Sequence, residues 1–239
     1  MTKHQKHNTF EGAPVILRRT NRKKTIALSV RDGTIAVLAP QRVSYKEIDD
    51  LIASKTSWLR RQLAKHAEIK RLTERRFVDG ETFLFLGEYY PLNIIDGSQA
   101  SAKLVNGRFV VHVQRNYAPK RRERSIRAAF LCWYKSVAGS YIEQRVRHQA
   151  AAMALSPTRI SYHGYKSIWG KCTSEGELAF NWKLVMGPLE IIDYVVVHEL
   201  AHLCHPNHSR EFWETVETAM PDYRPRRKWL KEHGRTLTI

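Results

Sequence analysis

The stretch Asp193-Tyr-Val-Val-Val-His-Glu-Leu-Ala-His202 joins an apolar run to the pattern His-Glu-x-x-His. The run is too short to cross a membrane, and Pro188 and Glu190 just before it favour the start of a helix. We therefore expect a buried helix. Residues four apart on a helix lie on one face, about one turn or roughly 6 Å apart, so His198 and His202 can share one zinc ion.

The glutamate of this pattern is expected to act as a general base. Glu199 is one residue from His198, so its side chain projects beside the metal and not into its coordination shell. There it can take the proton from a zinc-bound water. Zinc prefers four tetrahedral ligands, and a catalytic site keeps one position for water. A third protein ligand is therefore expected downstream.

Two further histidines follow in the stretch Leu203-Cys-His-Pro-Asn-His208. His205 is roughly 10 Å along a helix axis from His198, and it precedes Pro206, which disfavours helical backbone. His208 follows this break, so the chain can return to the metal. Its spacing equals that of the metzincin pattern, although His205 stands where that pattern has glycine. We predict His208 as the third ligand, with His205 as the alternative.

Other potential ligands near this stretch rank lower. Cys204 is two residues past His202 and points away from the ligand face, so a buried structural thiol is expected there. If neither His205 nor His208 binds the metal, Glu211 or Glu214 would be the next candidates.

Composition limits the class of protein. The chain has 239 residues, of which 43% are hydrophobic, enough for one large or two small domains with a sizeable core. Three widely spaced cysteines argue against a disulfide framework and fit a reducing cytoplasm. No stretch approaches the roughly 18 apolar residues of a membrane span, and the polar first residues predict no secretory signal.

The net charge of +17 predicts an attraction to anions such as nucleic acids, nucleotides or anionic membrane surfaces. Basic residues concentrate at positions 18–24, 120–124 and 224–228. The same runs are equally compatible with solvated faces that bind nothing.

The residues before 117 predict a β-rich part. Residues 1–13 have the composition of a loose tail, and a β-hairpin-rich part with one helix is expected over 14–116. Asp32-Gly33 and Asn106-Gly107 each lie between β-branched runs, as hairpin turns do. Ser44 and Glu47 match a capping box, which predicts a helix to about residue 71.

The remaining residues, 117–239, are expected to form the catalytic domain. A long amphipathic helix should begin at Pro119 and reach about residue 153. Strands are predicted over 159–162 and 177–182, with a turn over 167–172 between them. Short helices over 209–220 and 226–233 complete an α+β fold class.

These residues resemble the YgjP-like metallopeptidase family, which is related to the SprT-type zinc proteases. The resemblance rests on residues 167–172, 180–184 and 193–203, on Asn207-His-Ser209 and on Phe212-Trp213, with looser matches at 79–81 and 86–90. It implies a zincin-like catalytic domain with a small sheet packed against the HExxH helix. It also implies zinc on His198, His202 and His208, with Glu199 as base.

A cytoplasmic zinc peptidase is therefore the expected function, with a peptide as substrate and no membrane partner. Two alternatives keep the metal: a zinc-dependent nucleoside triphosphate pyrophosphohydrolase, acting for example on UTP, and a DNA-associated SprT-like protease. A nucleic-acid-binding module with structural zinc fits less well, because such zinc sites usually have four protein ligands, mostly cysteines.

Several residues near the expected site are candidates for binding substrate. Trp169 and Asn181 belong to the resembling motifs and are candidate substrate-binding residues. The residue that stabilises the oxyanion is left open among four candidates: Tyr162, His163, Tyr165 and Tyr223.

Overall fold

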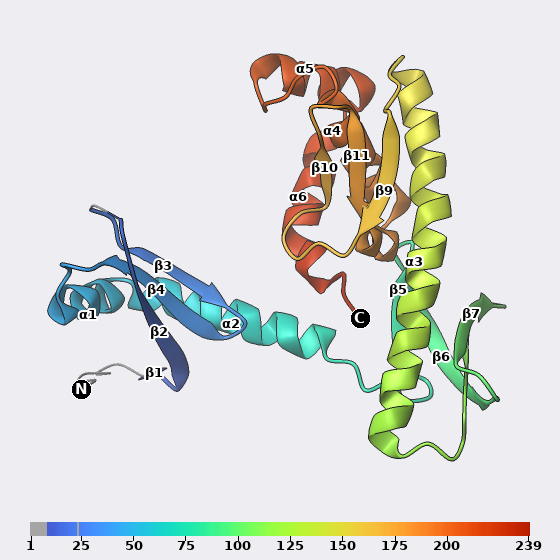
Figure 1. Ribbon diagram of the computed structural model, residues 1–239, viewed down its shortest axis with the longest axis horizontal. Coiled ribbons are helices and arrows are strands. Elements are labelled where there is room, and N and C mark those ends of the chain that lie inside the picture. Colours follow the sequence, from blue (N-terminus) through green and yellow to red (C-terminus); the bar gives the residue numbers. More distant parts are fainter. Residues whose placement is uncertain (1–8, 23) are drawn as a thin grey trace. The chain divides into compact units, whose positions relative to one another are not determined.

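The computed structural model describes residues 9–22 and 24–239. The chain divides into two compact units, residues 1–74 and residues 75–239, and Figure 1 labels most of the elements of each. This division differs from the boundary expected at residues 116 and 117. The expected tail 1–13 also differs, because Thr9–Phe10 form strand β1 and strand β2 begins at Ala13. Residues 1–8 of that tail lie outside the described residues.

The first unit is a four-stranded sheet with two helices. Its strand order is β1, β2 (Ala13–Thr20), β4 (Thr34–Pro40) and β3 (Ala27–Arg31), with β2 parallel to β4. Helices α1 (Tyr45–Ser54) and α2 (Thr56–Thr73) supply the other half of its core. The buried members of that core are Val30, Ile35, Val37, Ala39, Ile48, Ile52 and Leu59.

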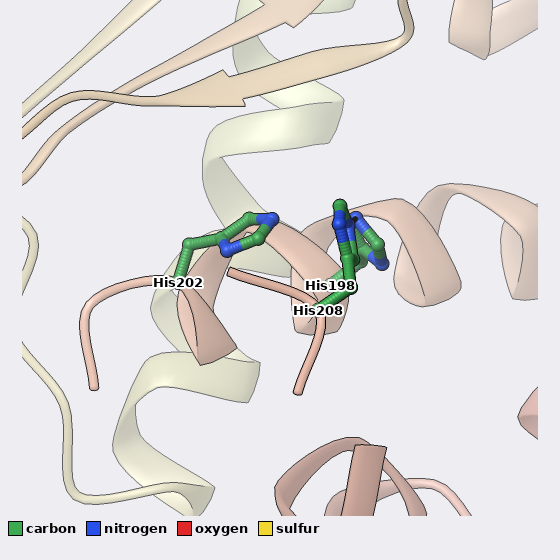
Figure 2. A group of neighbouring side chains, drawn as sticks. All are labelled: His198, His202 and His208. Carbon is green, nitrogen blue, oxygen red and sulfur yellow. Dashed lines mark hydrogen bonds between the residues drawn. The ribbon is translucent and has the colours of Figure 1, made fainter. Parts of the chain in front are cut away.

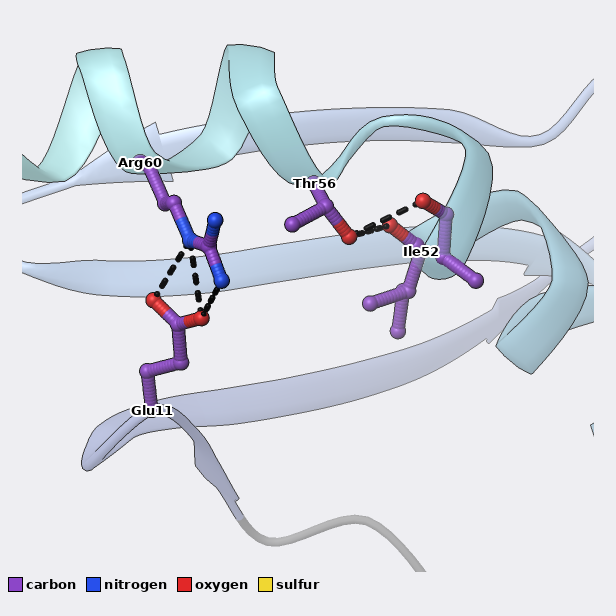
Figure 3. Close-up of polar contacts among 5 residues, drawn as sticks. Glu11, Ile52, Thr56 and Arg60 are labelled. Atoms are coloured by element: carbon purple, nitrogen blue, oxygen red, sulfur yellow. Dashed lines mark hydrogen bonds and ion pairs between the residues drawn. The ribbon is translucent and has the colours of Figure 1, made fainter.

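The capping box at the start of α1 is confirmed. The Ser44 hydroxyl accepts from the Glu47 backbone N–H, and the Glu47 carboxylate accepts from the Ser44 backbone N–H. The single helix expected to residue 71 is instead two helices that meet at Lys55. At this junction the Thr56 hydroxyl donates to the carbonyl of Ala53 at 2.9 Å, and Arg60 pairs with Glu11 beside it (Figure 3).

The second unit begins with another small sheet. Its strand order is β5 (Thr82–Phe85), β6 (Glu88–Asp96), β8 (Arg108–Val113) and β7 (Ser101–Val105). The sheet packs on the long helix α3 (Pro119–Ala152), where Phe83 stacks on Phe130 and Phe109 meets Trp133 edge to face. This shared core is the physical reason that residues 75–116 belong with the helix that follows them.

The two units share one strand arrangement. In the first unit, β2 is followed by the hairpin β3–β4, and β4 pairs parallel with β2. In the second unit, β6 is followed by the hairpin β7–β8, and β8 pairs parallel with β6. A helix follows the hairpin in both units. The hairpin turns are Asp32-Gly33 and Asn106-Gly107, with φ of 48° and 73° in one and 48° and 71° in the other. Positive φ at both central residues is what a type I′ turn requires.

The rest of the second unit is the part that carries the chemistry. A three-stranded sheet has the order β10 (Gly170–Cys172), β11 (Glu177–Asn181) and β9 (Arg159–His163), and it lies beside α3 (Figure 1). The expected turn over 167–172 thus contains a short strand. After a 3-10 turn over Trp182–Met186 come α4 (Leu189–Ala201), α5 (Arg210–Ala219) and α6 (Tyr223–His233), then a final 3-10 turn over Gly234–Thr236.

Helix α4 is the centre of this unit. Its residues Ile191 to Val197 are buried, as the apolar run predicts. It packs against α3, α5, α6 and β10. Among the helices in the described parts of the chain, none is long and apolar enough to cross a membrane.

One ion pair links α4 to α3. Arg145 donates to both carboxylate oxygens of Asp193, at 2.5 and 2.8 Å, and the two side chains are 27% and 13% exposed. We expect Arg145→Ala to lower the free energy of unfolding by about 3 kcal/mol, because it leaves a largely buried carboxylate unpaired. The melting temperature of a unit this size should fall by about 6 to 12 °C.

The matched control for this prediction is Arg147→Ala. Arg147 pairs with Glu143 on the same helix, but its side chain is 76% exposed. Loss of such a surface pair should change stability by less than about 0.5 kcal/mol. Thermal unfolding of both variants by circular dichroism decides the matter, and equal losses would show that the Arg145 pair is not a special link between the helices.

Candidate metal centre

The candidate ligands lie at the C-terminal end of α4. His198 and Glu199 are in its last turn, and His202 is the residue that ends the helix. Because residues four apart share a helical face, the rings of His198 and His202 lie on the same side, with centroids 5.1 Å apart. The helix buries its apolar residues in the core and brings this one polar face to the surface of a cavity.

The third histidine of the cluster arrives from the loop after α4. Pro206 follows the helix end, and Ser209 caps the start of α5 by accepting from the backbone N–H of Phe212. His208 therefore sits between two helices. Its ring stacks on Trp213 of α5, with centroids 5.7 Å apart and planes 23° apart.

These three imidazoles form the only group of potential metal-ligand side chains found among the described residues. One ring nitrogen from each of His198, His202 and His208 can be chosen so that all lie within 4.8 Å of one another. Figure 2 shows the rings of His198 and His208 side by side, with the ring of His202 turned toward them. The Nε2 atoms of His198 and His208 are 3.1 Å apart.

His205 is placed differently from the three. Its ring Nε2 lies 3.1 Å from the Thr215 hydroxyl on α5, outside the cluster. Its backbone carbonyl accepts a hydrogen bond from His202 Nδ1 at 2.9 Å. A carbonyl can only accept, so this hydrogen bond places a proton on Nδ1 of His202 and leaves Nε2 as the nitrogen that could bind a metal. This is the tautomer that a metal ligand needs, and His205 supports it through the backbone.

The protonation and surroundings of the three rings fit a divalent metal ion. Burial lowers the pKa of His198 to about 3, and burial also lowers the pKa of His208, so both rings are neutral. Neighbouring His202 contributes to both shifts. The Nδ1 atom of His198 is buried and has no hydrogen-bond partner within the described chain. Ring nitrogens of three imidazoles within 4.8 Å of one another form a donor set that suits zinc.

Glu199 lies on the wall of the same cavity. Glu199 is 5% exposed, and burial raises the pKa of its carboxyl group to about 8. A cation held by the neighbouring histidines would favour the ionised form and so oppose this shift. A carboxyl group poised near neutral pH can both accept and return a proton.

The cavity has a volume of about 790 Å³. Its wall includes the three histidines and Glu199, a continuous stretch of chain over residues 168–174, and the side chains of Tyr194 and Leu230. Tyr194 was not among the sequence candidates, although its place four residues before His198 puts it on the ligand face. Burial raises its pKa to about 12, so its phenol keeps its proton and can donate a hydrogen bond at neutral pH.

The four residues named for oxyanion stabilisation are not in this cavity wall. Tyr162 lies against Gly139 of α3, and its hydroxyl is buried there without a partner in the described chain. His163 and Tyr165 contact each other, and Tyr223 stacks on Trp213 with centroids 5.3 Å apart. Tyr194 is thus the tyrosine that the fold brings to the cavity.

Trp169 and Asn181 have different surroundings. Trp169 lines the cavity, so substrate contact stays a prediction for it. Asn181 is 2% exposed and is not in the cavity wall. Its side-chain amide donates to the carbonyls of Tyr165 and Ile168, at 2.9 and 3.0 Å. This arrangement does not support substrate binding by Asn181, because its side-chain amide is already hydrogen-bonded to backbone groups of the protein.

The cysteines form no disulfide, and Cys204 is exposed. The expectation that it is a buried structural thiol is wrong, because it lies in the turn that follows α4. Cys172 lies on β10 in the cavity wall, where burial raises the pKa of its thiol. It is therefore protonated and a weaker nucleophile than a thiolate.

Comparison with known proteins adds one strong match. A family model described as YgjP-like, metallopeptidase domain, matches residues 24–233. Among solved structures, the crystal structure of the metallopeptidase zymogen of Pyrococcus abyssi abylysin matches with 20% identity and a TM-score of 0.36. That match covers 41% of this chain and 96% of the other, and at this TM-score it carries no argument. The comparison with curated proteins gives no match.

Proposed function

Since the chain belongs to the YgjP-like metallopeptidase family, we propose that it is a zinc-dependent peptidase that acts in the cytoplasm. His198, His202 and His208 would hold the zinc ion, in a zincin-like arrangement of the HExxH helix α4 beside the small sheet β9–β11. The cluster of three imidazoles supports this assignment, and so do the lowered pKa values of His198 and His208. The exposed cysteines Cys132 and Cys204 are compatible with a reducing compartment.

The bound zinc ion would supply Lewis acidity, which polarises a carbonyl group and makes a water molecule easier to deprotonate. Glu199 would take that proton as general base and later deliver it to the leaving amine. The burial of Glu199 supports this role, because a carboxyl with a raised pKa can act in both directions near neutral pH. Tyr194 would donate a hydrogen bond to negative charge that develops in the cavity.

The observation that favours a peptide substrate is a free strand edge along the cavity. Strand β10 is the outer strand of its sheet. The Asn181 N–H donates to the Trp169 carbonyl, and the Thr173 N–H donates to the Glu177 carbonyl. By alternation, Gly170 and Cys172 turn their backbone N–H and C=O groups away from β11. Both residues line the cavity, so an extended peptide can pair with them there.

A screen of two substrate classes tests this proposal. The full chain with one equivalent of zinc is incubated with fluorescein-labelled β-casein, and separately with the four nucleoside triphosphates under a pyrophosphate readout. We expect casein cleavage that a zinc chelator removes, and no pyrophosphate release. Metal-dependent pyrophosphate release without casein cleavage would instead establish the pyrophosphohydrolase alternative. Association of the basic runs with nucleic acid, as in a DNA-associated protease, stays a prediction of the sequence.

A further inference from the structure

Gly170 on β10 touches the side chain of Glu199 on α4. A Cβ atom built on Gly170 would lie 2.4 Å from Oε1, 2.5 Å from Cγ and 2.6 Å from Cδ of Glu199. Such distances are far inside van der Waals contact. The backbone of Gly170 does not require glycine, because its φ is not positive. The requirement is space: only a residue without a side chain lets the strand lie against this carboxyl group.

The strand cannot easily retreat, because Asn181 holds the chain just before it. The backbone N–H of Asn181 donates to the Trp169 carbonyl at 2.8 Å. Its side-chain amide donates to the carbonyls of Tyr165 and Ile168. The remaining oxygen, Oδ1, accepts from the Lys183 backbone N–H at 3.2 Å. One buried amide on the central strand β11 therefore fixes the loop that leads into Gly170.

Trp169 also contacts the C-terminal 3-10 turn. A Cβ atom on Gly234 would lie 2.9 Å from Cζ2 of the Trp169 ring. The ring therefore lies directly on the Gly234 backbone. Trp169 thus contacts this turn and also accepts a hydrogen bond from Asn181, so the adjacent Gly170 has little freedom to move away from Glu199.

We propose that Gly170 is a positioning residue for Glu199: its bare backbone, held by Asn181 and Trp169, keeps the carboxyl group on the cavity wall beside the three histidines. The steric part of this inference concerns only the two residues in contact. The catalytic part rests on the proposed function, because it concerns the orientation of the general base. Two experiments therefore test the two parts separately.

The steric part is tested by a double-mutant cycle in melting temperature. We expect Gly170→Ala to lower the melting temperature of the metal-free full chain by about 3 to 10 °C, the range of an overpacked core position. In a Glu199→Ala background the same change should cost less than about 1 °C, because the clashing atoms are gone. Gly139→Ala is the control, since its Cβ would meet only Tyr162 at an ordinary 3.5 Å. Equal losses at Gly170 in both backgrounds would overturn the proposal.

If Gly170→Ala fails to fold, the comparison with the double variant Gly170→Ala, Glu199→Ala still tests the contact. Folding of Gly170→Ala with Glu199→Ala, but not of Gly170→Ala alone, would support the steric contact. Failure of both would show that Gly170 is needed for reasons unrelated to Glu199, and would overturn the proposal.

The catalytic part is tested with zinc-loaded protein and labelled β-casein. Gly170→Ala should lower kcat by roughly 100-fold, as displacement of a catalytic group by about 1 Å does, with KM and zinc content little changed. In a Glu199→Ala background, where Cγ, Cδ and Oε1 are all absent, the same change should lower the residual kcat by less than about threefold. An equal cost in both backgrounds would contradict positioning. If no variant cleaves casein, the melting-temperature cycle still decides the contact, and only the proposed function fails.

Discussion

His208→Ala is expected to weaken zinc binding by more than about 100-fold. Removal of a residue that only hydrogen-bonds a metal ligand already costs about 10- to 100-fold in metal affinity, and His208 is itself a predicted ligand. The variant keeps His198 and His202, and two imidazoles leave the ion without a third protein ligand. His208 is exposed, and its ring contacts Phe212 and Trp213 at the start of α5, so the fold should survive its removal. Zinc content after dialysis against a chelator of graded strength measures the effect, with circular dichroism as the check on folding.

His205→Ala is the matched control for that change. Its ring contacts Thr215 and lies outside the cluster, and the carbonyl that supports His202 belongs to the backbone, which alanine keeps. We expect zinc affinity to change by less than about tenfold. Loss of the metal from His205→Ala, with retention in His208→Ala, would contradict the assigned ligand set.

Glu199→Gln is expected to keep zinc and lose turnover. Glutamine has the shape of glutamate but cannot accept the proton, so kcat on casein should fall by about 10²- to 10⁴-fold, the contribution of a positioned general base. The change also replaces a buried carboxyl group by a neutral amide, so stability should not suffer. Steady-state kinetics and zinc content measured on the same preparation test both statements. Full activity in this variant would show that Glu199 is not the base.

Local signals in the sequence predicted the elements that local interactions determine. The Ser44–Glu47 box and the Asp32-Gly33 and Asn106-Gly107 turns need only neighbouring residues, and the structure contains all of them. The apolar run before His198 likewise predicts a buried helix, and α4 is one. The break between α1 and α2 at Lys55 has no proline or glycine to announce it, so periodicity alone extends one helix through it.

Elements that depend on distant partners could not be predicted in this way. Strand β10 has three residues and exists because it pairs with β11, so its sequence looks like a turn. The boundary between the units depends on packing of β5–β8 against α3, which no composition change marks.

The candidate site shows the same division. The spacing of His198, His202 and His208 predicted the cluster, since helix geometry and a chain break determine it. The role of Asn181 depends on carbonyls more than ten residues away, so the sequence could not distinguish support of the loop from contact with substrate. Gly170 contacts Glu199 across an even longer separation, and its need for space is visible only in the structure.

The position of the metal decides whether His198, His202 and His208 are its ligands. Anomalous diffraction at the zinc absorption edge, on crystals of the zinc-loaded full chain, locates the ion among its ligands. We predict one strong peak at about 2.0 to 2.1 Å from one ring nitrogen of each of His198, His202 and His208, with the Glu199 carboxyl group outside the coordination shell. A peak bound by His205 or Cys204, or a site closed by four protein ligands, would contradict it.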